Sequence, residues 1–406
     1  MRACPDCVRP CFGDRCQVRE TEFCLWILSW DAQLPSVSHP EWLAARTVHL
    51  IGGCRAFNGF DPTVEFFPKT LDGLTTRFQS RQYGSLCSEL AAMDVAPLGF
   101  EFLSHSMEAK GLVPTNWRTY HPWTKANIWP CHDQMDTWAQ IAYAASEANN
   151  AVLWDLARRI GHQLRVCAWR LYQLSEAYRS QLAARTAERD LKPGIRFEDG
   201  FTWLGYLAVQ VFLVDACVLR DYLAEFFFYY VCPAAERPKK HVASMSGLKK
   251  TVLSKVASSD PLFGALNAAT SAEGWLFVLG AYRDLSVHCV PLARAESKLW
   301  AVSTEFPIRG AKSLLGVSLP LPSDPSEIAA ARTSASRNVR LAQELLLLTS
   351  ATRGEVASTD ALVYCYQALD QLTQLTSNLS ERSPVAPRIP QLSEKDFLGP
   401  ITVRRV

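Results

Sequence analysis

The stretch AVLWDLARRIGHQLRVCAWRLYQLSEAYRSQL, residues 151–182, carries apolar side chains at every third or fourth position. The same spacing is already present upstream, from Met135. The stripe consists of Met135, Trp138, Ile141, Ala145, Val152, Leu156, Ile160, Leu164, Cys167, Leu171, Leu174, Tyr178 and Leu182. A repeat near 3.6 residues places these side chains on one face of an amphipathic helix. We therefore predict two long helices, or one bent helix, that pack against a helical core.

The segment 201–231, FTWLGYLAVQVFLVDACVLRDYLAEFFFYYV, is the most apolar part of the chain. It is long enough to cross a bilayer, but four charged residues interrupt it: Asp215, Arg220, Asp221 and Glu225. Charged side chains at that depth are costly in lipid. We predict a helix buried inside a bundle, and no membrane partner.

Helical spacing continues at residues 271–290, 326–350 and 358–379, whereas residues 1–130 are irregular. That first region contains short β-prone runs at 21–30, 46–53 and 63–68 and one helical run at 85–93. The fold class that we predict is mainly α. An all-α bundle at 131–380 follows a mixed α/β or loop-rich region at 1–130, and residues 381–406 form an extended, proline-rich tail.

The composition is that of a globular protein: 406 residues, 48% apolar, 20% charged, with a net charge of +2. No overall cationic field therefore attracts nucleic acid, and an RNA partner requires a local basic patch. Many of the 13 cysteines stand singly within apolar runs, which is typical of proteins in a reducing compartment. The first residues, MRACPDCVRPCF, lack the apolar core of a signal peptide. We expect a cytoplasmic protein.

The segment AYRDLSVHCVPLA, residues 281–293, contains Arg283, Asp284 directly after it, and His288. Pro291 follows three residues later, and its ring would collide with the carbonyl of Val287 in a continuous helix. We therefore predict that the helix kinks or restarts close to His288. In a straight α-helix, positions five apart lie about 140° around the axis, so a break or a second copy of the chain would help Arg283 and His288 to converge.

This arrangement resembles the R-x(4–6)-H signature of HEPN domains, in which a polar residue follows the arginine. The resemblance covers the motif and its helical context at roughly 135–380. It implies an all-α, usually homodimeric bundle in which two motifs face each other across a cleft. It also implies a metal-independent endoribonuclease of phage defence or of a toxin–antitoxin system, with RNA as substrate and an antitoxin or another protein as partner. Arg283 and His288 would carry the chemistry, and Asp284 would support them.

The chemistry of these side chains suits RNA cleavage without a cofactor. A histidine that titrates near neutral pH can act as general base on the ribose 2′-OH or as general acid on the leaving oxygen. A guanidinium can brace the phosphate and stabilise its negative charge. Two alternatives stay open. Arg283 and Asp284 can be solvated beside a hydrogen-bonded His288, or the bundle can bind a partner protein, a nucleotide or RNA without catalysis.

A basic connector precedes the motif and includes Lys239, Lys240, Lys249 and Lys250. These lysines can neutralise RNA phosphates near the site. A solvated loop and helix face is the alternative explanation.

Four closely spaced cysteines lie within residues 1–24: Cys4, Cys7, Cys11 and Cys16. Their density fits a small structural zinc site, and a disordered terminus is the alternative. A second group in 120–136 comprises His121, Cys131, His132, Asp133 and Asp136. This group is either a metal or substrate patch or, as we favour, part of a packing segment rich in tryptophan and proline.

Overall fold

The structure is a computed structural model. It describes residues 45–58, 62–70, 73–80, 83–102, 116–120, 129–187, 192–256, 259–289, 300–322, 325 and 358–390. Contacts between backbones divide the chain into two compact units, Met1–Leu43 and Ala44–Val406. The first unit lies outside the described residues, and with it the β-prone run at 21–30 and the cysteines at 4–16. The described fold is that of the second unit.

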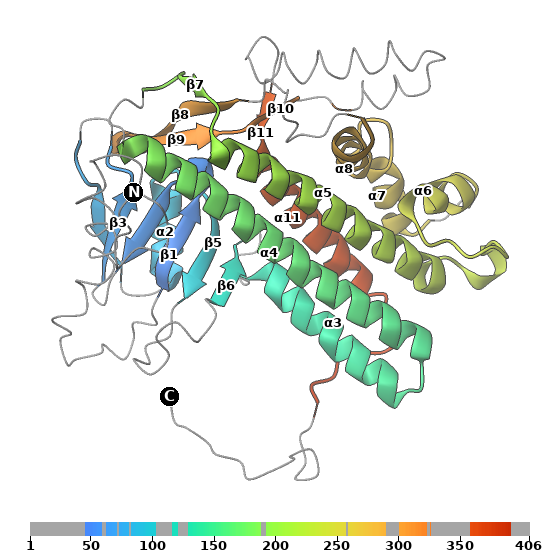
Figure 1. Ribbon diagram of the computed structural model, residues 1–406. Coiled ribbons are helices and arrows are strands. Elements are labelled where there is room, and N and C mark those ends of the chain that lie inside the picture. Colours follow the sequence, from blue (N-terminus) through green and yellow to red (C-terminus); the bar gives the residue numbers. More distant parts are fainter. Residues whose placement is uncertain are drawn as a thin grey trace, which may run out of the picture. The chain divides into compact units, whose positions relative to one another are not determined.

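A six-stranded antiparallel sheet occupies the first part of this unit (Figure 1). Its strands are β1 (Ala45–Leu50), β2 (Arg55–Asn58), β3 (Thr63–Phe67), β4 (Arg77–Gln79), β5 (Pro97–Phe102) and β6 (Asn116–Thr119). They lie in the order β4-β3-β2-β1-β5-β6, and helix α2 (Tyr83–Ala92) connects β4 to β5. Alternation within β3 buries Val64 and Phe66 on one face. The β-prone runs at 46–53 and 63–68 and the helical run at 85–93 coincide with β1, β3 and α2.

Four long helices build the bundle: α3 (Pro130–Glu147), α4 (Ala151–Ala187), α5 (Gly200–Phe226) and α11 (Ala361–Ser380). Every member of the apolar stripe of the sequence is buried except Val152, so the prediction of amphipathic helices is confirmed. Helices α3 and α4 are separated by a turn at residues 148–150. Gly161 lies inside α4, where a Cβ would be 3.5 Å from the Met135 carbonyl oxygen and from the Trp138 Cβ. These distances are ordinary van der Waals contacts, so α3 and α4 pack closely here and an alanine would also fit.

Helix α5 continues into a π-helical turn, η4 (Phe227–Val231), and coincides with the apolar segment of the sequence. Among the described residues it is the one helix long and apolar enough to cross a membrane, with a mean hydropathy of 1.7, and half of its most apolar window is buried. Its buried face packs against α4, α8 and α11, as expected for a core helix. Its exposed face carries Leu204, Leu207, Val211 and Val214.

Shorter helical elements follow α5. They are η5 (Ala234–Glu236), α6 (Met245–Leu248), η6 (Lys249–Leu253), α7 (Pro261–Ala269), α8 (Trp275–Asp284) and η7 (Leu285–Cys289). The helix predicted at 358–379 is α11, and Asp360 caps it by accepting a hydrogen bond from the Val363 amide. The helix predicted at 326–350 lies outside the described residues. Residues 381–390 have no regular secondary structure, as expected for an extended tail.

The prediction that residues 131–380 are all α-helical is wrong. Five strands lie within this range: β7 (Arg196–Phe197), β8 (Ala301–Ile308), β9 (Ala311–Ser318), β10 (Pro320–Pro322) and β11 (Ser358–Asp360). Strands β8 and β9 form a hairpin whose connection contains Gly310 at φ 82°. Burial largely alternates along β8, which is the two-residue period of a half-buried strand. The described chain is therefore mainly α-helical, with a sheet near its start and smaller sheets beside the bundle.

Sheet and bundle share one core, because α4 packs against β6 and against the short 3-10 turn η2 (Ile51–Gly53) between β1 and β2. The indole of Trp117 in β6 donates a hydrogen bond of 2.8 Å to the Ala168 carbonyl of α4. Gly53 lies so close to α4 that a Cβ would be 2.6 Å from the Tyr178 carbonyl oxygen. These contacts between sheet and bundle bring polar side chains of β1 and β5 next to α4.

Candidate functional site

Arg283 and Asp284, the first two residues of the R-x(4–6)-H motif, end helix α8. The Arg283 Nε lies 2.9 Å from the Asp284 Oδ1, and each side chain is 32% exposed. The two groups therefore form an ion pair that solvent can reach. The Arg283 Nε is itself buried and donates no hydrogen bond to any described residue, so the pairing with Asp284 is one of charge alone.

His288, the third residue of the motif, belongs to the π-helical turn η7 that follows directly. Its backbone is described, whereas its side chain and Pro291 lie outside the described residues. The helix changes its hydrogen-bond pattern at the place where the sequence predicts a kink or restart. The same pattern occurs in η4 and η6, and η7 differs from them in containing His288 of the motif.

A second Arg–Asp dipeptide, Arg220–Asp221, lies on α5, which packs against α8. Arg220 is buried, and its Nη2 is 3.1 Å from the Asp221 Oδ1. A Cβ at Gly280 of α8 would be 2.9 Å from the Arg220 Nη1, so this glycine leaves room for the guanidinium. Asp221 also accepts a hydrogen bond from the Met245 amide. These charges on the apolar helix are internal structural pairs.

The four lysines of the basic connector differ in their surroundings. Lys239 and Lys240 are exposed in the loop before α6, and Lys250 is exposed on η6. Lys249 instead donates to the Thr270 carbonyl and lies 5.8 Å from the centre of the Phe277 ring. Three of the four ammonium groups are therefore open to an external anion.

The cysteines at 4, 7, 11 and 16 lie outside the described residues, while the described cysteines are free thiols. Most of these thiols are buried, and burial raises the pKa of Cys54 to about 12 and that of Cys131 to about 11. They behave as small apolar side chains and not as nucleophiles.

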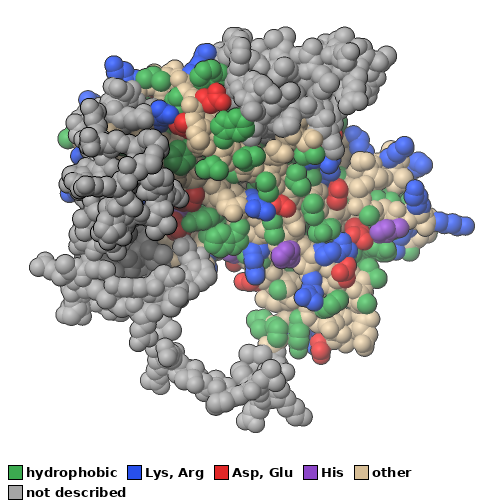
Figure 2. Space-filling model, in the orientation of Figure 1, with side chains coloured by type: hydrophobic (Ala, Val, Ile, Leu, Met, Phe, Trp, Pro, Cys, Tyr) green, Lys and Arg blue, Asp and Glu red, His purple; other side chains and the backbone are tan. Residues whose placement is uncertain are grey.

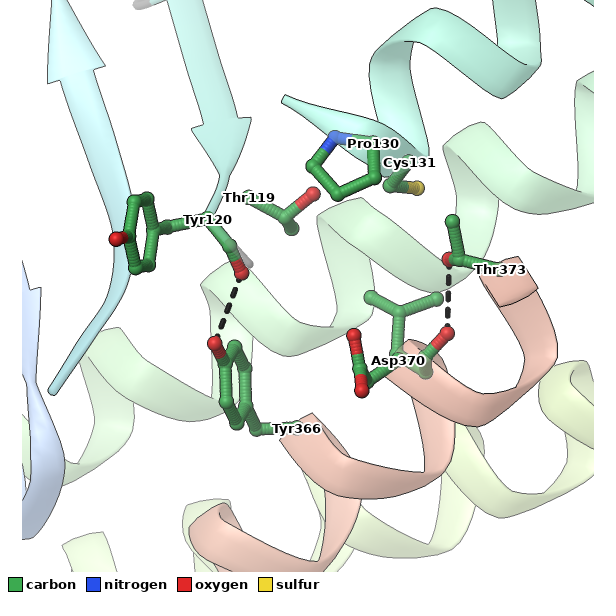
Figure 3. A pocket seen from close by; sticks show the side chains of 8 residues that line it. Thr119, Tyr120, Pro130, Cys131, Tyr366, Asp370 and Thr373 are labelled. Carbon is green, nitrogen blue, oxygen red and sulfur yellow. Dashed lines mark hydrogen bonds between the residues drawn. The ribbon is translucent and has the colours of Figure 1, made fainter. Parts of the chain in front are cut away.

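Cys131 lies at the start of α3 beside a narrow crevice (Figure 3), and His132 follows it on the same helix. The crevice is lined by Thr119, Tyr120, Pro130, Cys131, Tyr366, Leu369, Asp370 and Thr373. Its volume of about 10 Å³ is close to the space that a single water molecule needs, so it cannot hold a substrate. The His132 Nε2 is 2.9 Å from the Trp117 carbonyl oxygen, and burial lowers the His132 pKa to about 4. These two residues have the packing role that we favoured.

An open groove of about 360 Å³ runs between α3 and α4. Its polar and aromatic lining comes from Tyr143, Trp154, Arg158, His162 and Arg165. The Arg158 guanidinium lies 4.8 Å from the centre of the Trp154 ring. Neither Arg158 nor Arg165 forms an ion pair with any residue that the structure describes. Figure 2 shows basic and hydrophobic side chains intermixed on the face that contains α4 and α5.

A buried polar cluster lies where β1 and β5 meet α4. The His49 ring places Nδ1 2.9 Å from the Ser175 Oγ and Nε2 3.0 Å from the Glu101 Oε2. The Glu176 Oε1 lies 3.9 Å from the same Nε2 and 2.9 Å from the Arg55 Nη2. We name His49, Arg55, Glu101, Ser175 and Glu176 the His49 cluster.

Burial governs the electrostatics of the His49 cluster. It lowers the pKa of His49 well below the usual value, and the charge of Arg55 acts in the same direction. The neighbouring Tyr172 donates to the Glu101 Oε1 at 3.2 Å. Burial and the two carboxylates raise the pKa of this phenol.

Serine, histidine and glutamate in contact suggest a hydrolytic triad, but the arrangement cannot act as one. Ser175 is fully buried, so a substrate cannot reach its hydroxyl. A catalytic serine must lie where its oxygen can attack a bound carbonyl. The cluster can position charges or hold an ion, but it cannot supply a nucleophile.

The His49 cluster was missed in the sequence because His49 and Ser175 are 126 positions apart, and His49 and Glu101 are 52 apart. The one local signal is Ser175, a polar residue beside the apolar stripe of α4. The R-x(4–6)-H motif, by contrast, is contiguous and visible in the sequence.

Comparisons of the chain with family models, with curated proteins and with solved structures find no match in any of the three.

Proposed function

We propose that the chain is a metal-independent endoribonuclease of the HEPN type. Arg283 and His288 act on the RNA phosphate and ribose, and Asp284 orients the arginine. The observation that supports this proposal is the π-helical turn η7, which begins directly after Asp284 and contains His288. An i→i+5 hydrogen-bond pattern places more residues in each turn than the 3.6 of an α-helix. Positions 283 and 288 therefore lie closer on the helix surface than the roughly 140° of an α-helix allows.

The chemistry follows from the two side chains. The imidazole takes the proton of the ribose 2′-OH or returns one to the leaving 5′-oxygen, and the guanidinium stabilises the phosphate oxygens. By the resemblance, attack of the 2′-OH leaves a cyclic phosphate. A cytoplasmic role in phage defence or as a toxin, with an antitoxin or another protein as partner, belongs to the same proposal.

The groove between α3 and α4 favours a second candidate function, a helical bundle that binds RNA or a nucleotide without cutting it. Incubation with end-labelled single-stranded RNA in EDTA separates the two. The nuclease produces fragments with cyclic-phosphate ends, and a protein carrying both Arg283→Ala and His288→Ala produces none. RNA that is bound and left intact by the wild-type protein supports the second candidate.

Replacement of Trp154 by alanine is expected to weaken RNA binding by about 5- to 150-fold, because stacking of a base on an aromatic ring contributes about 1–3 kcal/mol. Arg158→Ala and Arg165→Ala together should remove about two phosphate contacts, and so reduce the slope of log affinity against log salt by about 2. Fluorescence anisotropy across a salt series measures both effects. Arg77→Ala is the matched control, because Arg77 is exposed and paired with Glu65 on the sheet. An unchanged affinity in all three groove variants would remove the groove from the RNA interface.

Homodimerisation is expected through the exposed face of α5. Leu204, Leu207, Val211 and Val214 are spaced by three and four residues, as in the seam of a coiled coil. A protein carrying Leu207→Glu and Val211→Glu should be a monomer at micromolar concentration, since charges cannot be buried in that seam. Light scattering after size exclusion measures the mass. Leu74→Glu, at an exposed leucine outside this face, should leave the dimer intact. A wild-type monomer at high concentration contradicts the expectation.

A further inference from the structure

Three side chains of the His49 cluster direct metal-ligating atoms at one point. The His49 Nε2, an oxygen of Glu101 and an oxygen of Glu176 all lie within 4.8 Å of one another. They come from β1, β5 and α4, so the fold itself assembles them. We propose that His49, Glu101 and Glu176 bind a divalent transition-metal ion. This site goes beyond the proposed nuclease and does not depend on it.

The spacing fits such an ion. Nitrogen and oxygen ligands bind these ions at about 2.0–2.2 Å, which places neighbouring ligand atoms about 3–3.6 Å apart. The Nε2 of His49 is 3.0 Å from the nearer carboxylate oxygen and 3.9 Å from the other. The three ligand atoms lie within 4.8 Å of one another, close to that spacing without an ion between them. One imidazole and two carboxylates suit manganese, iron or zinc.

Each ligand is held by a further partner. The Ser175 hydroxyl contacts the Nδ1 of His49, the Tyr172 phenol donates to Glu101, and the Arg55 guanidinium donates to Glu176. Outer contacts of this kind fix the orientation of metal ligands and are as characteristic of metal sites as the ligands themselves. The Trp117 ring packs against the imidazole, with the two ring centroids 4.7 Å apart.

Charge and access favour a cation at this point. Arg55 and Arg179 both pair with Glu176, at 2.9 and 3.7 Å, whereas Glu101 pairs with no arginine among the described residues. Among these residues, the Glu101 carboxylate therefore meets only the His49 ring and the Tyr172 phenol. The Glu101 and Glu176 side chains are 17% and 30% exposed, so an ion can enter from the carboxylate side. Water can complete its coordination there.

Calorimetric titration of the full chain with Mn²⁺ tests the proposal. Manganese is the probe because carboxylate and imidazole bind it, whereas thiolates such as those at residues 4–16 prefer softer ions. We expect one bound ion per chain. Glu101→Gln and Glu176→Gln should each weaken binding by at least about 10-fold, and Ser175→Ala by about 10-fold through loss of the outer contact. Glu65→Gln, on the same sheet but paired with Arg77, should bind like the wild type.

Melting curves recorded with and without Mn²⁺ provide a second readout, since an ion that binds only the folded state raises its melting temperature. The wild type and Glu65→Gln should show this rise, and Glu101→Gln should lose it while melting cooperatively without the metal. Absence of Mn²⁺ binding by the wild type overturns the site. Binding by Glu101→Gln and Glu176→Gln that is as tight as that of the wild type overturns it too. The RNA assay in EDTA is unaffected by either result, so the two proposals fail independently.

Discussion

The His288→Ala variant is expected to cleave RNA at least about 100-fold more slowly than the wild type, because a positioned general acid or base contributes about 10²- to 10⁴-fold. Arg283→Ala should lose a comparable factor, since removal of one group that stabilises developing charge costs about 10²- to 10³-fold. Single-turnover cleavage, with the protein in excess over the RNA, measures the chemical step. The binding affinity for RNA should change much less than the rate.

Two further variants sharpen this comparison. Arg283→Lys keeps the charge but loses the planar fork that holds a phosphate by two hydrogen bonds, so we expect partial activity. Arg309→Ala removes an exposed arginine from the β8–β9 turn and should leave cleavage unchanged. Cleavage that persists in both His288→Ala and Arg283→Ala proteins, with folding intact, would falsify the assignment of the site.

Gly53→Ala is expected to lower the free energy of unfolding by about 2–5 kcal/mol. Gly53 adopts φ 79°, where a side chain costs about 1–2 kcal/mol. The added Cβ would also lie 2.6 Å from the Tyr178 carbonyl oxygen, which belongs to the backbone of α4 and cannot rotate away. Forced overpacking of this kind costs about 1–3 kcal/mol more.

Gly194 is the matched control, because its φ of 80° is nearly the same and a Cβ there would have no atom within 4 Å. Gly194→Ala should therefore cost only the conformational part, about 1–2 kcal/mol. Urea denaturation of both variants measures the difference. Equal losses would mean that the contact between the η2 turn and α4 is looser than the structure describes.

The bundle could be predicted because its signal is local. Met135 and Leu182 are far apart, but each step of the stripe between them spans only three or four residues, and one helix face follows directly from that period. The motif at 283–288 is visible for the same reason. The cap of α11 is local too, since Asp360 directly precedes the helix that it caps.

The sheets and the His49 cluster depend on pairing between distant segments. The neighbours of β1 are β2 and β5, and β5 follows α2 in the chain. The pairing of β5 with β1 therefore cannot be predicted from any short segment of the sequence. The β8–β9 hairpin had a local sequence signal in Gly310 alone, because apolar and polar residues do not alternate along the sequence of β8. The residues around His49 converge only once sheet and α4 have packed together.

Helix α11 packs against α3, α4 and α5, although it is encoded long after them. When α5 has just been translated, the nascent chain exposes the apolar faces of α3, α4 and α5, because α11, which covers them, has not yet been made. We expect the nascent chain to need chaperones during this interval, and premature stop codons before residue 361 to yield protein that aggregates or is degraded.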